Sequence, residues 1–63
     1  MSEAVRKYLQ NLGFKYDESK AMSNMSRKEL TDKIANHPEI GKKFSRKTYE
    51  VERHMKDNKV YYI

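Results

Sequence analysis

Apolar residues recur at helical spacing near the beginning of the chain. Four of them fall on one face of a helix: Val5, Tyr8, Leu9 and Leu12. Ser2 is suited to cap the start of this helix. Gly13 followed by Phe14 is typical of a Schellman end, in which a left-handed glycine precedes an apolar residue. The pattern predicts a helix from Glu3 to Leu12.

A second helix has a clear start signal. Ser26 and Glu29 have the spacing of a capping box, in which each side chain bonds the backbone N–H of the other residue. Pro38 ends the helix, because the residue before a proline avoids helical geometry. The predicted span is Arg27 to Ala35, with Leu30, Thr31 and Ile34 on its inner face. Two apolar anchors and a turn glycine are expected after it: Ile40, Phe44 and Gly41.

A third helix is predicted from Ser45 to Asp57. Phe44 and Tyr49 have the spacing of a hydrophobic staple at its beginning. Asn58 suits the left-handed backbone that ends a helix. The inner stripe of this helix consists of Thr48, Val51 and Met55.

Two short segments have the composition of strands. Phe14 to Tyr16 alternates apolar and polar residues, and Val60 to Ile63 contains only strand-forming residues. Because a lone strand is unstable in water, we expect the two to pair. Asp17 to Asn24 is expected to be a loop, with Met22 turned into the core. The predicted fold class is mostly α: a three-helix helix-turn-helix core with a small two-stranded β element.

The segment SRKELTDKI, followed after a gap by SRKTYEVERHMKDNKVYYI, resembles the helix-turn-helix core of winged-helix DNA-binding domains. The resemblance covers about residues 3 to 63 and implies that helix 45–57 enters the major groove of DNA. Two features depart from the family. The connection from Asn36 to Phe44 has nine residues, more than the usual turn, and one strand follows where a wing needs a hairpin.

Length and composition exclude several classes of function. The 63 residues make one small domain, 1–63, and the absence of cysteine excludes disulfides and thiolate metal sites. No apolar run has the length of a membrane span, which favours a cytoplasmic protein, nucleoid-associated if the organism is prokaryotic. His37 and His54 are expected at the surface. We expect no catalysis, metal, cofactor or small-molecule substrate, because no nucleophile has a base and no ligand cluster is present.

The net charge of +5 indicates an anionic partner, and its distribution favours the second part of the chain. Residues 1–24 have four basic and three acidic groups, a net of +1, whereas residues 25–63 have ten and six, a net of +4. Four cations surround the predicted start of the third helix: Lys42, Lys43, Arg46 and Lys47. A helix N-terminus attracts anions, so these cations predict a phosphate site there.

The outer face of the third helix has the residue types that contact DNA. Ser45, Arg46, Tyr49, Glu50 and Arg53 are predicted to contact duplex DNA from this helix. Arginine reads guanine edges, glutamate accepts from cytosine, and tyrosine reaches phosphates or stacks on bases. Two cations at the start of the second helix are predicted to hold neighbouring phosphates: Arg27 and Lys28.

The leading hypothesis is therefore a sequence-specific protein that binds double-stranded DNA, as a transcriptional regulator or an accessory factor. The alternative is an interaction module that binds an acidic protein surface, with Val60 to Ile63 adding a strand to a partner or to a second copy of the chain. RNA binding is a third hypothesis that composition leaves open.

Overall fold

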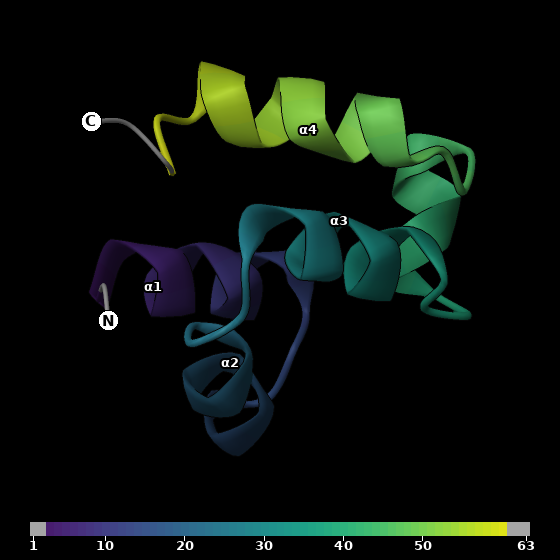
Figure 1. The fold of residues 1–63 in the computed structure, drawn as a ribbon. Coiled ribbons are helices and arrows are strands. Elements are labelled where there is room, and N and C mark those ends of the chain that lie inside the picture. The colour runs from purple at the N-terminus through teal and green to yellow at the C-terminus, as the bar shows by residue number, and fades with distance from the viewer. Residues whose placement is uncertain (1–2, 61–63) are drawn as a thin grey trace.

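The computed structural model of the chain describes residues 3–60. Within this range, four α-helices and a 3-10 helix follow one another: α1 (Glu3–Leu12), α2 (Tyr16–Met22), α3 (Arg27–Ala35), η1 (Ile40–Phe44) and α4 (Thr48–Asp57). Figure 1 shows α4 running back across the molecule in the direction opposite to α3, with η1 at the bend between them. α1 packs against α2, and α3 packs against η1 and α4.

The first helix has the bounds and the inner face that the sequence predicts, and the four apolar residues of its stripe are buried. Its Schellman end is confirmed. The backbone N–H of Phe14 donates to the carbonyl of Leu9 at 3.1 Å, and that of Gly13 donates to Gln10 at 3.0 Å. Gly13 has a φ of 126°, which L side chains rarely adopt. Ser2 lies outside the described residues.

The segment after α1 corrects the predicted fold class. The strand predicted from Phe14 to Tyr16 and the loop predicted from Asp17 to Asn24 are both wrong, because α2 covers most of this region. The described part of the chain contains no strand, so the two-stranded β element of the prediction is absent from it. Within residues 3–60 the fold consists of helices joined by turns and bends.

Local bonds and burial explain why this segment is helical. The carboxylate of Glu18 accepts a hydrogen bond from the backbone N–H of Lys15 at 3.1 Å, which satisfies a donor at the start of α2. Ser19 and Met22 lie one turn apart and are both buried. Met22 therefore lies in the core, as predicted, but on a helix rather than in a loop.

The third element in the chain, α3, has the span that its capping box predicts. The backbone N–H of Glu29 donates to the hydroxyl oxygen of Ser26 at 3.2 Å, and the backbone N–H of Ser26 donates to the Glu29 carboxylate at 3.2 Å. The inner face of the helix is fully buried and consists of Leu30, Thr31, Ile34 and Ala35.

Gly41 has a different role from the one expected. Ile40 and Phe44 are buried anchors, as predicted, but Gly41 lies inside η1 rather than in an open turn. A Cβ atom at Gly41 would stand 2.3 Å from the carbonyl oxygen of Ala35. Glycine is therefore needed here because two backbone segments approach closely.

The start of α4 also differs from the prediction. The helix begins at Thr48, not at Ser45, because Ser45 and Arg46 have φ values of 53° and 57°. These left-handed residues end η1, and the N–H of Arg46 donates back to the carbonyl of Gly41 at 2.9 Å. Thr48 is exposed, so the inner stripe of α4 consists of Val51 and Met55.

A second Schellman motif ends α4. The N–H of Val60 donates to the carbonyl of Met55 at 3.0 Å, and Lys59 has a φ of 56°. The left-handed residue is thus Lys59 and not Asn58, whose φ is −94°. Val60 is buried and lies in a bend, while the rest of the predicted strand, Tyr61 to Ile63, lies outside the described residues.

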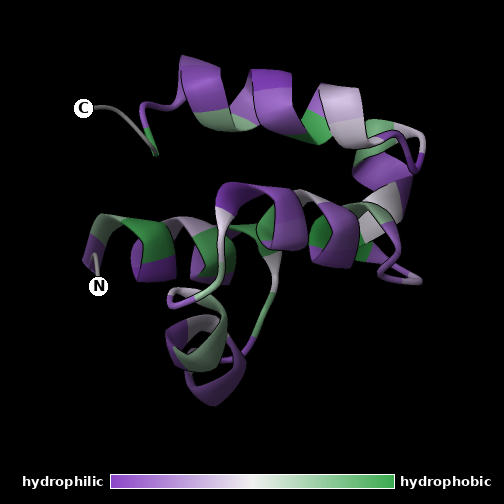
Figure 2. Ribbon diagram, in the orientation of Figure 1, coloured by the Kyte–Doolittle hydropathy of each residue, from purple (hydrophilic) through white to green (hydrophobic). Residues whose placement is uncertain are grey.

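A single apolar core joins the elements. It draws residues from all five elements, from Phe14 between α1 and α2, and from Val60 after α4. Figure 2 shows α4 mainly in the hydrophilic colour, with its hydrophobic positions on the side toward α3. The surface that remains for binding is therefore mainly polar and charged. The distribution of its charges determines which class of ligand or partner it can bind.

Candidate nucleic-acid interface

The cations of the basic stretch point to different parts of the molecule. The ammonium group of Lys43 donates to the carbonyl of Leu12 at 3.2 Å, at the end of α1. The last carbonyls of a helix lack partners and carry partial negative charge. Lys43 therefore stabilises the end of α1, and its side chain is turned away from the start of α4.

Arg46 is tied to the turn that follows α3. Its guanidinium donates to the carbonyls of Pro38 and His37 at 3.2 and 3.4 Å. Since Arg46 precedes α4 and has left-handed backbone, it does not share a helical face with Tyr49 and Arg53. The predicted stripe of contacts on one helix therefore loses its first arginine.

Three cations and a tyrosine remain together where η1 meets α4, and we call them the basic corner: Lys42, Arg46, Lys47 and Tyr49. The side chain of Tyr49 is prominent, with 55% of its surface exposed, and the ammonium of Lys47 lies 5.8 Å from the centre of its ring. No side chain caps the start of α4. Lys42 forms an exposed ion pair with Glu39 at 3.9 Å, which contributes little.

Glu50, in the first turn of α4, forms an ion pair at 3.9 Å with Arg53, which lies one turn further along the helix. Arg53 is largely exposed, whereas Glu50 is partly covered. These two residues lie on the same helix as Tyr49, so α4 retains three of the predicted contacts with bases. Ser45 is exposed in the turn before the helix.

Arg27 and Lys28 are not close to the basic corner. They are exposed at the first turn of α3, whereas η1 follows the last turn of that helix. Nine residues of helix separate the two ends by about 13 Å. Figure 1 shows the start of α3 near the middle of the view and the bend at η1 at its right side, beyond the end of that helix. A contact of Arg27 or Lys28 with DNA would thus be a separate one.

Both histidines have structural partners that the sequence does not reveal. His37 accepts hydrogen bonds at Nδ1 from the backbone N–H groups of Glu39 and Ile40, at 3.1 and 3.0 Å, and so orders the turn before η1. His54 is exposed, as expected, but its Nδ1 lies 2.6 Å from the Tyr8 hydroxyl. No helical spacing could indicate a contact across 46 positions.

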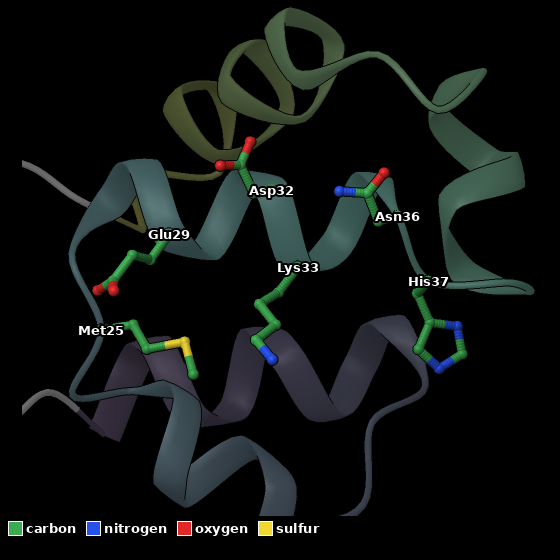
Figure 3. A pocket seen from close by; sticks show the side chains of 6 residues that line it. All are labelled: Met25, Glu29, Asp32, Lys33, Asn36 and His37. Carbon is green, nitrogen blue, oxygen red and sulfur yellow. The ribbon is translucent and has the colours of Figure 1, made fainter.

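An open groove with acidic sides lies between α2 and α3. A hollow of about 520 Å³ adjoins one of about 330 Å³, and the two share Met25, Lys33 and His37. Figure 3 shows the residues of the larger hollow along α3 and on the segments that flank it. Phe14 and Met22 contribute apolar surface. The carboxylates that line the groove belong to Glu18, Glu29 and Asp32.

A second groove lies between α1, η1 and the end of α4, and we call it the α1–α4 groove. It consists of two hollows of about 330 and 280 Å³ that share Tyr8, Asn11 and Asn58. Its charged residues are Lys7, Lys43 and Lys59. Sequence reasoning found only Lys43, because the other residues come from segments that meet only in the folded chain.

No family model, no curated protein and no solved structure matches this chain. The residues from 3 to 60 include no helix with the length and apolarity needed to cross a membrane. They also include no group of three or more histidine, cysteine or acidic residues that could hold a metal ion. The features of the described residues that bear on function are therefore the positions of the basic side chains, in the basic corner and in the α1–α4 groove.

Proposed function

We propose that this chain binds double-stranded DNA through the basic corner and the exposed face of α4. The observation that carries the proposal is the start of α4, which no side chain caps and where three cations gather. No acidic residue occurs from Ile40 to Tyr49, and the carboxylate of Glu50 in the first turn is paired with Arg53. The positive end of a helix dipole disfavours such a cluster unless an anion is bound nearby. Phosphate is the anion that the duplex supplies at regular intervals.

The residues divide into positioning and reading roles. Lys42 and Lys47 hold phosphates, since their ammonium groups are exposed point charges. Tyr49 reaches a phosphate or a sugar beside them. Glu50, next to Tyr49, and Arg53, one turn further along the helix, contact base edges in the groove. The recognition helix of this proposal is α4, Thr48–Asp57, rather than the longer segment expected from the sequence.

Two residues of the original prediction have altered roles. Lys43 supports the end of α1, and Arg46 bonds the turn after α3, so each contributes to the shape of the corner. Arg46 remains exposed and keeps N–H groups beyond the two that donate to carbonyls. It can therefore contact a phosphate while it holds the turn.

Fluorescence anisotropy with a random duplex and a single strand, over a series of salt concentrations, tests the proposal. We expect micromolar binding of the duplex, tighter than that of the single strand, with log K falling linearly against log salt. Absence of duplex binding at low salt would overturn it. An acidic partner protein would then be the remaining candidate for the corner, and a pull-down would test that alternative.

A further inference from the structure

We propose that the α1–α4 groove is an anion site for a compact ligand that carries a diphosphate group. Its two adjoining hollows, of about 330 and 280 Å³, have the size of small-molecule sites. The groove is separate from the basic corner, since Lys7 and Lys59 belong to its lining and not to the corner. The inference therefore goes beyond the proposed function and does not rest on it.

The charges in the groove have one sign. Lys43, from η1, lines one hollow, whereas Lys7 from α1 and Lys59 from the turn after α4 line the adjoining one. The ammonium of Lys7 also forms an exposed ion pair with Glu3 at 3.9 Å, which contributes little. No carboxylate occurs among the described residues that line it. The α2–α3 groove, by contrast, is lined by three carboxylates and one lysine. Acidic and basic groups are thus sorted between the two grooves.

Neutral donors accompany the lysines. The side-chain amides of Asn11 and Asn58 line both hollows. The amide nitrogen of Asn58 donates to the carbonyl of His54 at 2.8 Å and also lies 3.4 Å from Nδ1 of His54, so this amide is held at the wall of the groove. The ammonium of Lys43 uses one of its three protons on Leu12. An anion in the groove would therefore meet several donors at once.

The donor set favours phosphate over carboxylate. Arginine holds a carboxylate with a planar pair of N–H groups, and the residues described along the groove include no arginine. Lysine acts on phosphate as a point charge. Three lysines along the two hollows match a ligand that spans both and has two or more negative charges, which a diphosphate group carries. Free pyrophosphate and a nucleoside diphosphate share this chemistry.

The test is an NMR titration of the whole chain with pyrophosphate and, separately, with ADP, at constant ionic strength. We expect saturable shifts of the side-chain amides of Asn11 and Asn58 and of the His54 ring. Lys59→Gln should weaken binding about tenfold, since it removes a charge-assisted contact. Tighter binding of ADP than of pyrophosphate would show that the nucleoside also contacts the groove.

Two controls make the result decisive. Lys33→Gln removes a lysine from the α2–α3 groove and should leave the affinity for both ligands unchanged. Lys59→Gln should leave binding of duplex DNA within about twofold, so a failure here is distinct from a failure of the proposed function. Shifts spread evenly over exposed lysines, shifts confined to the basic corner, or the absence of shifts would overturn the proposal.

Discussion

The Tyr8 hydroxyl lies 2.6 Å from Nδ1 of His54, and this contact joins the first helix to the last. Burial raises the pKa of Tyr8 to about 12, so the hydroxyl keeps its proton at neutral pH, within hydrogen-bond distance of the imidazole. The edge of the same imidazole ring contacts Phe44, with ring centres 5.1 Å apart.

The raised pKa of Tyr8 predicts a loss of stability in alkali. Above the ordinary tyrosine pKa of 10.0 the unfolded chain releases this proton, while the folded chain keeps it until about pH 12. The contribution of the Tyr8 proton to the free energy of unfolding is therefore fully present below pH 10. It is lost as the pH rises to 12, by about 2–3 kcal/mol in all. Tyr8→Phe should cost about 1 kcal/mol near neutrality, because it removes the bond to His54.

Urea unfolding of the wild type and Tyr8→Phe at about pH 9 and about pH 11.5 tests this prediction. The variant cannot ionise at this position, so the stability difference between the two proteins should shrink or reverse at the higher pH. Exposed groups such as lysines titrate in both proteins and cancel in the comparison. An equal difference at both pH values would contradict it.

Gly41→Ala should destabilise the fold by about 2–3 kcal/mol, because the new methyl group would meet backbone rather than a movable side chain. Gly13→Ala is the matched control. There the added Cβ would lie 3.4 Å from Ile40, an ordinary contact, and the cost of about 1 kcal/mol comes from the positive φ. Thermal unfolding ranks the two variants. A smaller loss in Gly41→Ala than in Gly13→Ala would show that η1 does not approach α3 this closely.

Ser19→Ala should leave stability unchanged or raise it by up to about 1 kcal/mol. The Ser19 hydroxyl is fully buried, and no described residue gives it a hydrogen-bond partner. Ser23→Ala is the comparison, since the Ser23 hydroxyl donates to the carbonyl of Lys20 at 2.7 Å, and its removal should be mildly destabilising. Denaturant midpoints of both variants decide the matter, and the reverse order would show that Ser19 has a partner in solution.

Arg46 and Arg53 should respond differently to alanine. Arg46→Ala removes the bonds to the carbonyls after α3 and should lower stability by about 1 kcal/mol. Arg53→Ala removes only an exposed ion pair and should change stability by less than about 0.5 kcal/mol, while it relaxes base preference. Thermal unfolding and anisotropy on duplexes of different sequence measure the two effects. Equal stability losses would contradict the assignment of Arg46 to the turn.

Lys47→Gln should weaken binding to all duplexes alike and reduce the slope of log K against log salt by about one unit. Its ammonium lies at the start of α4 and contacts no base in the proposed arrangement. Lys20→Gln, on α2 and exposed, has the same change of charge and should leave the slope unaltered. Equal effects of the two substitutions would mean that net charge alone, and not the basic corner, attracts DNA.

Local signals account for the parts of the fold that were predicted correctly. α1 and α3 have the expected bounds because their stripes and caps lie within a few residues of each other: Gly13 follows one helix, and Ser26 with Glu29 begins the other. The alternation of apolar and polar residues from Phe14 to Tyr16 led to the wrong prediction of a strand. That strand depended on pairing with Val60 to Ile63 at the distant end of the chain, which no local pattern could test. A seven-residue helix has little local stability, so packing against α1 decides whether α2 forms.

In the candidate site, too, local sequence patterns predicted one part and tertiary packing decided the other. Sequence located the basic corner as an acid-free stretch, but it assigned Ser45 and Arg46 to a helix that begins only at Thr48. Their left-handed backbone depends on how η1 packs against α3, which no local pattern expresses. Lys43 therefore bonds a carbonyl at the end of α1, and Arg46 bonds carbonyls in the turn after α3, rather than facing outward along α4.

The sequence by itself determined the two capped helices, most of the buried apolar residues and the excess of positive charge in the second part of the chain, because caps, periodicity and charge are local properties. Only the tertiary structure decided that residues 16–22 form a helix, where α4 begins, and which lysines line a common groove. The two hollows of the α1–α4 groove take Lys7, Lys43 and Lys59 from three segments. Such convergence depends on packing between elements far apart in the chain, which spacing along the sequence cannot express.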